Sequence, residues 1–209
     1  MARTAHTEHS DKVYVSIVGG KFAQKVKSTT DGAVKRYSDK GKKDVYEILY
    51  QDLSGRIRML KIEKTDYGKQ LAILLDDVGE ETQISIPVDS KYFDNFCSKI
   101  QNADLSKEIK LAPYSFMPKD KQTKMTGINI YQSGEKLGYY YSKENPMGKP
   151  FPAKEGMDED EWKMFKLQER AFFQKMIEEL AKKISSKASS NEQPNNETLV
   201  PTPDDDLPF

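Results

Sequence analysis

Cysteine, histidine and long apolar runs are scarce in this sequence. Cys97 is the only cysteine, which excludes an intrachain disulfide and any zinc site built mainly from cysteines. Both histidines, His6 and His9, lie near the start of the chain, where neither histidine catalysis nor a complete metal site is expected. No apolar run approaches the ~18 residues of a membrane span and no signal peptide is visible, so we expect a reduced, cytoplasmic protein.

Sequence motifs of common catalytic sites are missing as well. There is no Gly-x-x-x-x-Gly-Lys-Ser/Thr phosphate loop, no dinucleotide fingerprint, no Gly-x-Ser-x-Gly elbow and no His-Glu-x-x-His pair. Asp76 and Asp77 are interpreted as solvated turn residues, and a carboxylate-metal nuclease is the alternative that they leave open. We therefore expect a protein that is not an enzyme and that uses no metal and no cofactor.

The charges that are present are unevenly distributed. Lysine and arginine balance aspartate and glutamate, 33 against 33, yet residues 185–209 hold five acids and one lysine, a net charge of −4. The remainder of the chain therefore carries +4. A mildly basic body with an acidic tail suits a nucleic-acid binder whose tail competes for the same surface. Residues 1–11 are predicted to be flexible, and the Ser-, Asn-, Pro- and Glu-rich residues 185–209 to be a disordered linker and tip.

The chain ends in a compact acidic and aromatic motif, which consists of Asp204, Asp205, Asp206, Leu207, Pro208 and Phe209. A partner would need an apolar pocket for the Phe209 ring and a basic clamp for the terminal carboxylate, with ion pairs from the aspartates at the rim. An ordinary frayed terminus is the alternative. Because the only aromatic residue after Ser185 lies directly beside the acids, the pattern predicts a docking peptide for other proteins.

This tip resembles the acidic tip of bacterial single-stranded-DNA-binding proteins, in which it docks replication and repair enzymes. A second segment, Tyr139 to Pro150, resembles phage-type members of that family, in which a Tyr-x-Lys-x-Asn-Pro-like strand end leads into a Gly- and Pro-rich connector. The resemblance implies an OB fold and sequence-nonspecific binding of single-stranded DNA in replication, recombination and repair. It also implies a bacterial cytoplasmic setting, with either a host or a phage origin.

Alternating apolar residues predict seven or eight strands with short connections. Pro113 indicates that its strand is an edge strand or is bent. Spacing alone permits several small β architectures. With the resemblance we expect a mainly β protein, in which an OB-type antiparallel barrel with one internal helix spans residues 12–156. The expected strands are Lys12–Lys27 (kinked at Gly19 and Gly20), Val45–Tyr50, Arg56–Lys64, Leu71–Leu75, Thr82–Val88, Ile109–Phe116, Met125–Tyr131 and Leu137–Tyr141.

Two helices are expected from apolar residues spaced three and four apart. The first begins after Ser90, which can cap it, and presents Phe93, Phe96 and Ile100 on one face, with Cys97 as a small core residue. The second spans residues 157–184, with acids at its start and lysines at its end. We expect its wide apolar stripe to pack on the barrel, and self-association is the alternative.

Basic residues interleaved with aromatic residues indicate where single-stranded DNA would bind. Lys27 to Lys43 is predicted to be a loop with six basic residues around Tyr37. Such a pattern grips single strands because cations meet phosphates while rings stack on bases. The predicted stacking residues are Phe22, Tyr37, Tyr46, Tyr50 and Tyr67, and the predicted phosphate contacts are Lys25, Lys35, Arg36, Arg56, Arg58 and Lys61.

Two classes of function follow from the sequence. The first is a single-stranded-DNA-binding protein whose tip recruits replication and repair enzymes, with a recombination annealing protein as a subtype. The second is a protein-interaction adaptor, in which the barrel binds another protein. The two classes differ in whether the body binds unpaired DNA in a salt-sensitive manner.

Overall fold

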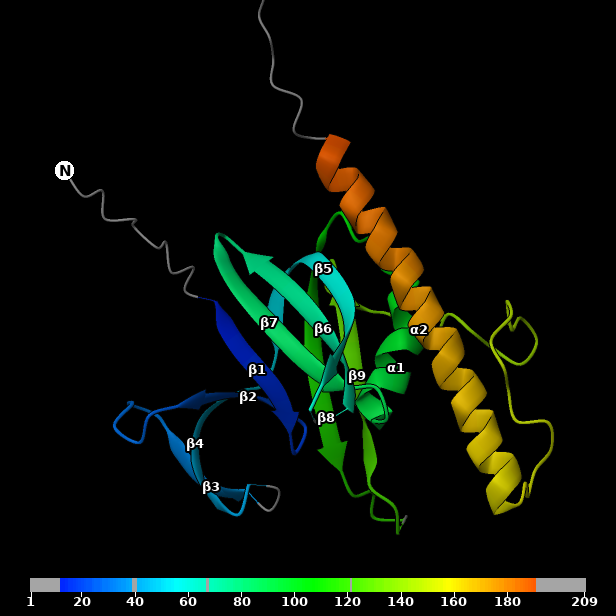
Figure 1. Ribbon diagram of the computed structural model, residues 1–209, viewed down its shortest axis with the longest axis horizontal. Coiled ribbons are helices and arrows are strands. Elements are labelled where there is room, and N and C mark those ends of the chain that lie inside the picture. Colours follow the sequence, from blue (N-terminus) through cyan, green and yellow to red (C-terminus); the bar gives the residue numbers. More distant parts are fainter. Residues whose placement is uncertain (1–11, 39–40, 67, 121, 191–209) are drawn as a thin grey trace, which may run out of the picture.

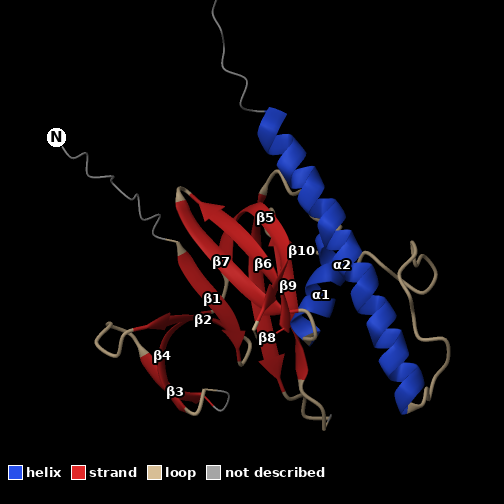
Figure 2. Ribbon diagram, viewed as in Figure 1, coloured by secondary structure: helices blue, strands red, loops and turns tan. Residues whose placement is uncertain are grey.

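The computed structural model describes residues 12–38, 41–66, 68–120 and 122–190, which form one mixed sheet and two helices. The ten strands of the sheet follow the order β10-β9-β8-β5-β6-β7-β1-β2-β4-β3, and the helices lie on one side of the molecule (Figures 1 and 2). The strands are β1 (Val13–Val18), β2 (Lys21–Val26), β3 (Val34–Ser38), β4 (Lys43–Tyr50), β5 (Leu53–Thr65), β6 (Gly68–Asp77), β7 (Glu80–Pro87), β8 (Glu108–Phe116), β9 (Met125–Gln132) and β10 (Glu135–Lys136).

The mainly β class is confirmed, but the fold is not the purely antiparallel arrangement expected. Strand β1 runs parallel to β7 and antiparallel to β2. The strand order is linear, with β10 at one end and β3 at the other, so the hydrogen-bonded sheet of the described residues does not close into a barrel.

Three strand predictions need correction. Lys12–Lys27 is not one kinked strand but the hairpin β1–β2, because Gly19 and Gly20 both adopt positive φ angles, 58° and 84°, and reverse the chain. The predicted loop of residues 27–43 contains β3, which pairs with β4. The predicted strand of residues 137–141 is not a strand, because this segment turns towards α1 (Lys91–Ile100), with the Tyr140 amide donating to the Ser98 carbonyl at 2.8 Å.

Strand β8 changes its neighbours along its length. Its first half pairs with β5, from Leu53 opposite Leu111 to Arg56 opposite Glu108. Strand β9 pairs with β8 from Lys110 to Phe116. Pro113 lies beyond the part that pairs with β5, opposite Ile128 of β9. A proline lacks an amide donor, so this position, with a single strand neighbour, tolerates it.

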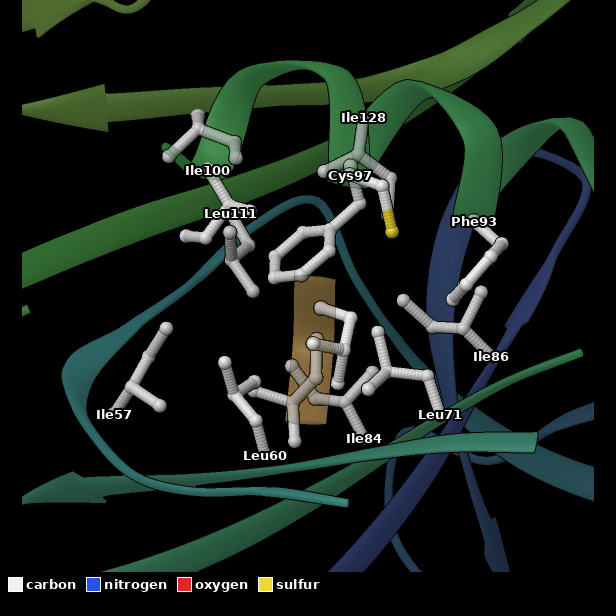
Figure 3. Close-up of a cluster of buried hydrophobic side chains, with 14 of the residues drawn as sticks. Ile57, Leu60, Leu71, Ile84, Ile86, Phe93, Cys97, Ile100, Leu111 and Ile128 are labelled. Carbon is white, nitrogen blue, oxygen red and sulfur yellow. The ribbon is translucent and has the colours of Figure 1, made fainter. Parts of the chain in front are cut away.

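The core lies inside the curl of the sheet and is capped by α1. The side chains labelled in Figure 3 converge from β5, β6, β7, α1, β8 and β9 on one space. Phe93, Phe96 and Ile100 of α1 are fully buried there, as the helical spacing predicted. Cys97 is a buried, free cysteine, and burial raises the pKa of its thiol, which confirms a packing role for this side chain.

Helix α1 starts where its capping residue predicted. The Ser90 hydroxyl accepts a hydrogen bond from the Phe93 amide at 3.2 Å, and the Ser90 backbone is extended. This bond satisfies one of the amides that have no partner within the first turn of a helix.

The second helix, α2 (Glu159–Ser190), crosses the molecule beside α1 and β5 (Figure 1). It continues beyond residue 184, so the chain is helical over the first six residues of the segment that was predicted to be disordered. Phe173, Ile177 and Leu180 of α2 are buried in the core, while Met164 and Leu167 remain exposed. The tip, Asp204 to Phe209, and the histidines lie outside the described residues.

A buried ion network holds α2 in place. Lys149, in the connection before α2, donates to Glu169 at 2.6 Å, and Lys166 bridges Glu169 and Asp94 of α1. Burial alone would raise the pKa of the Glu169 carboxyl, but hydrogen bonds from Lys149 and Lys166 outweigh burial and hold that pKa below its usual value. The network therefore ties α2 to α1 with charges that each have a partner.

Over the described ranges, neither helix is apolar enough along its length to cross a lipid bilayer.

The β1–β2 turn packs against β8, although no strand pairing joins them. A Cβ atom on Gly20 would lie 2.8 Å from the Tyr114 carbonyl carbon and 2.9 Å from the Ser115 Cβ, so only glycine fits. The Tyr92 hydroxyl is hydrogen-bonded to the Ser115 side chain and to the Gly20 backbone, and burial raises its pKa. The first hairpin is thereby fixed to the body.

We expect Gly20→Ala to lower the free energy of unfolding by about 2–4 kcal/mol, because it adds a steric clash to the cost of a positive φ. Gly19→Ala is the matched control, since its Cβ would meet nothing within 4 Å. It should cost only about 1–2 kcal/mol. Urea unfolding of both variants measures the difference, and equal losses would show that the turn does not depend on its contact with β8.

Candidate nucleic-acid interface

Strands β2, β4 and β3, residues 21–50, form a curved arm on the opposite side of the molecule from α2 (Figure 1). Strand β4 pairs with β2 on one side and with β3 on the other, and β3 is the free edge of the sheet. Most of the residues that the sequence assigned to DNA binding lie on this arm.

One face of the arm gathers the predicted aromatic residues. Side chains alternate between faces along a strand, and directly opposed residues share a face. Tyr46 opposes Lys35, and Tyr37 lies two residues further along β3, a diagonal distance of about 7–8 Å. Tyr50 lies on the same face, four residues or about 13 Å from Tyr46. We call this set, Lys35, Tyr37, Tyr46 and Tyr50, the inner face of the arm, because it continues the face of β2 that enters the core.

The accessibility of the rings differs along the inner face. Tyr37 is 54% exposed, whereas Tyr46 and Tyr50 are half-buried, and the Tyr50 hydroxyl donates to Gln24 at 2.6 Å. Phe22 opposes Tyr50 but is fully buried, because this end of β2 enters the core. The prediction that Phe22 stacks on bases is therefore wrong, and Phe22 is a core residue.

The basic residues of the arm are divided between its two faces. Lys35 is on the inner face and forms an exposed ion pair with Asp44 at 2.8 Å, which raises the pKa of Lys35. Arg36 is on the outer face, where two of its nitrogens donate to the two oxygens of the buried Glu47 at 2.7 and 2.9 Å. Lys25 is exposed on the outer face and has no ion pair with any described residue.

The three basic residues predicted on β5 are not part of the arm. Arg58 pairs with Asp76 at 2.6 Å, and its hydrogen bond is the main cause that holds the pKa of that carboxyl below its usual value. Lys61 pairs with Glu63 at 3.2 Å. Arg56 and Arg58 line a cavity of about 460 Å³ beside Leu180 and other residues near the end of α2. Tyr67 lies outside the described residues.

A second aromatic cluster was not assigned from the sequence. It surrounds a cavity of about 450 Å³ formed by α1, β8, β9 and the segment after β10. The lysine of this cluster on α1, Lys99, follows Tyr92 and Phe96 at spacings of seven and three, so the helical period could have placed it on the apolar stripe. The cavity is lined by Lys99, Tyr114, Phe116, Met125, Asn129, Lys136, Leu137, Gly138 and Tyr139.

The arrangement on the arm suits binding more than catalysis. Rings and one cation share a face, so a flexible polyanion with planar groups could lie along it. No group of three or more histidine, cysteine or acidic side chains that could hold a metal occurs among the residues with described positions.

Comparisons of this chain with protein families, with curated proteins and with solved structures gave no match.

The ion pair with the buried Glu47 indicates that Arg36 stabilises the fold more than it contacts DNA. We expect Arg36→Met to lower the free energy of unfolding by about 2–3 kcal/mol, because it leaves the Glu47 carboxylate buried without its partner. Lys35→Met, next to it on β3 and in an exposed pair, should cause no measurable loss. Thermal or urea unfolding of the two variants checks the contrast, and an Arg36→Met protein as stable as the parent would contradict this assignment.

Proposed function

We propose that this protein binds single-stranded DNA without sequence preference and that its C-terminal tip recruits replication and repair enzymes. The observation that carries the proposal is the inner face of the arm, where Tyr46 opposes Lys35 and where Tyr37 and Tyr50 lie further along the same face. The acidic and aromatic end of the sequence gives independent support for the recruiting role.

The inner face would hold a strand through its bases and its phosphates together. Stacking of a base on a tyrosine contributes ~1–3 kcal/mol and tolerates every base, because every base has a π-face. Lys35 would exchange Asp44 for a phosphate. Lys25 lies on the opposite face of the sheet and would not contact a strand held on the inner face. Because three rings follow the curve of the arm, successive nucleotides could stack along it.

We also propose that residues of the body form an OB-type barrel that is incompletely closed. An OB fold is a five-stranded, partly open Greek-key barrel. The meander β5–β6–β7, followed by α1 and by the hairpin β8–β9 that pairs back onto β5, supports this interpretation. In such barrels the loops after the first and fourth strands contribute to oligonucleotide binding. Here the loop after the fourth strand begins just beyond the part of β8 that Gly20 contacts.

One observation favours the adaptor alternative. Lys35, Arg36, Arg58 and Lys61 each have a carboxylate partner. A surface whose cations are already paired attracts a polyanion less strongly than unpaired cations would. Such a surface, with exposed rings beside it, could instead bind a protein partner.

Titration with oligo-dT decides between these functions. The full chain should bind oligo-dT with an affinity that falls as salt rises, with a logarithmic slope of about −0.7 per neutralised phosphate. Tyr37→Ala and Tyr46→Ala should each weaken binding by about 5- to 150-fold, from the loss of one stack. Quenching of intrinsic fluorescence gives the binding constants.

The matched control is Tyr14→Ala. Tyr14 is 61% exposed, but it alternates with the buried Val15 and therefore lies on the outer face of the sheet. Its replacement should leave the affinity unchanged. Undetectable or salt-independent binding of oligo-dT by the intact protein would rule out the DNA-binding proposal and favour the adaptor.

Deletion of residues 204–209 should raise the affinity for oligo-dT at low salt and abolish partner binding, since the tip carries three of the acids that oppose the basic body. Replacing Asp204, Asp205 and Asp206 by asparagine should reproduce the gain in affinity, because charge drives the competition. Phe209→Ala should abolish partner docking alone. Unchanged DNA affinity after deletion would show that the tip does not compete.

A further inference from the structure

The cavity between α1, β8 and β9 holds a lysine in an unusual setting. Lys99 is 3% exposed and lies near the end of α1. Its ammonium group donates to the Asn95 side-chain oxygen at 2.9 Å and to the Ile128 carbonyl at 2.8 Å. No carboxylate of the described residues forms an ion pair with it, although lysines are almost never buried without such a partner.

Among the described residues, an aromatic ring and a second lysine complete the surroundings of the Lys99 ammonium group. An ammonium group has three donors, and two are used within the protein. The Tyr139 ring lies 5.1 Å from the Lys99 nitrogen, and Lys136 lines the same cavity. Burial, followed by the charge of Lys136, lowers the pKa of Lys99 to about 8. The other titratable groups around the cavity are the hydroxyls of Tyr114 and Tyr139.

The rest of the lining is aromatic and apolar. Tyr139 is 63% exposed, and Phe116 and Met125 are also exposed at the rim, while the Tyr114 ring lies 6.0 Å from that of Phe116. Asn129 adds an amide that could meet the polar edge of a ligand. The volume of about 450 Å³ lies within the range of about 300–1,000 Å³ that is typical of small-molecule pockets.

We propose that this cavity binds a nucleotide, with the phosphate at Lys99 and Lys136 and the base against the rings of Tyr114, Phe116 and Tyr139. A phosphate supplies the negative charge that the buried lysine lacks, and a planar base suits a lining with three rings. The same chemistry is offered by a free nucleotide and by one residue of a DNA strand. The site lies apart from the inner face of the arm and does not depend on DNA binding there.

Strand β8 lies between the cavity and the β1–β2 turn from which the arm extends. The backbone at Tyr114 contacts Gly20, at the root of the arm, and the Tyr114 side chain lines the cavity. A DNA strand that left the arm over this part of β8 could therefore place one of its nucleotides in the cavity.

The test is calorimetric titration of the full chain with deoxyadenosine 5′-monophosphate. Its phosphate is doubly charged above neutrality, so the nucleotide itself changes little between pH 7 and 9. Because a bound phosphate requires the charged form of Lys99, we expect the affinity to fall about tenfold between pH 7 and 9. A lysine with an ordinary pKa would give almost no change over this range.

Three variants distinguish the contribution of Lys99 to nucleotide binding from the effect of positive charge in general. Lys99→Met should weaken binding and remove the pH dependence, whereas Lys136→Met should weaken binding and keep it. Lys110→Met is the matched control, because Lys110 also lies over a ring, 5.2 Å from that of Tyr131, but is exposed and does not line this cavity. It should bind the nucleotide as the parent does. The pH profile of the parent protein needs no variant, so it decides even if Lys99→Met fails to fold.

Oligo-dA identifies the source of the nucleotide. If Lys99→Met weakens oligo-dA binding and removes its pH dependence, the site receives a nucleotide of the strand. If only the mononucleotide is affected, the site serves free nucleotides, and the proposal also holds. Three results would each overturn the nucleotide-binding proposal. The first is that neither the mononucleotide nor oligo-dA binds at this site, and the second is an affinity that does not change with pH. The third is that the site binds a peptide with the sequence of residues 204–209 and no nucleotide. The effect of Tyr37→Ala and Tyr46→Ala on oligo-dT binding tests the proposed function of the arm and does not bear on the cavity.

Discussion

The structure depends on side chains that cover two open edges of the curved sheet formed by β5 to β9. Strand β5 leaves β8 after Arg56, and β9 has only the short β10 as its outer neighbour. At the β9 edge, the Ile128 amide donates to the Asn95 side chain and the Ile128 carbonyl accepts from Lys99. Side chains of α1 thus take the place of a neighbouring strand, because buried backbone groups without partners are costly.

Helix α2 covers the other open edge, and its position relative to α1 must be fixed. Its buried residues, among them Phe173 and Ile177, cover the core beside β5. The Lys149–Glu169–Lys166–Asp94 network fixes that position, since all four groups would be costly to bury unpaired. Because both helices pack on the core, the arm and the outer surface of β8 and β9 remain accessible to ligands. Both surfaces carry tyrosines beside lysines.

Much of the local structure was accessible from the sequence. Ser90 and the apolar spacing after it predict α1, and runs of apolar residues, alternating or continuous, predict β5 to β9 within a few residues of their bounds. Tyr46 and Tyr50 are four residues apart in one strand, so the period of two residues places them on one face. The short strand β3 does not follow from the sequence, because Val34 to Ser38 is mostly polar and gains its strand conformation from pairing with β4. The tyrosines after β10 were mistaken for a strand because aromatic residues favour strands, whereas here Tyr141 packs on Phe172 of α2.

The sequence by itself determined the two helices and the strands β5 to β9, where the charges lie and which aromatic residues are candidates for stacking, since these follow from periodicity and residue type. Only the tertiary structure decided that Phe22 is buried, that Arg36 is occupied by Glu47 and that Lys99 is enclosed without an ion pair to any acid of the described residues. The physical reason is that exposure and charge pairing depend on residues far apart in the chain, which meet only when the sheet curls and the helices close its open edges.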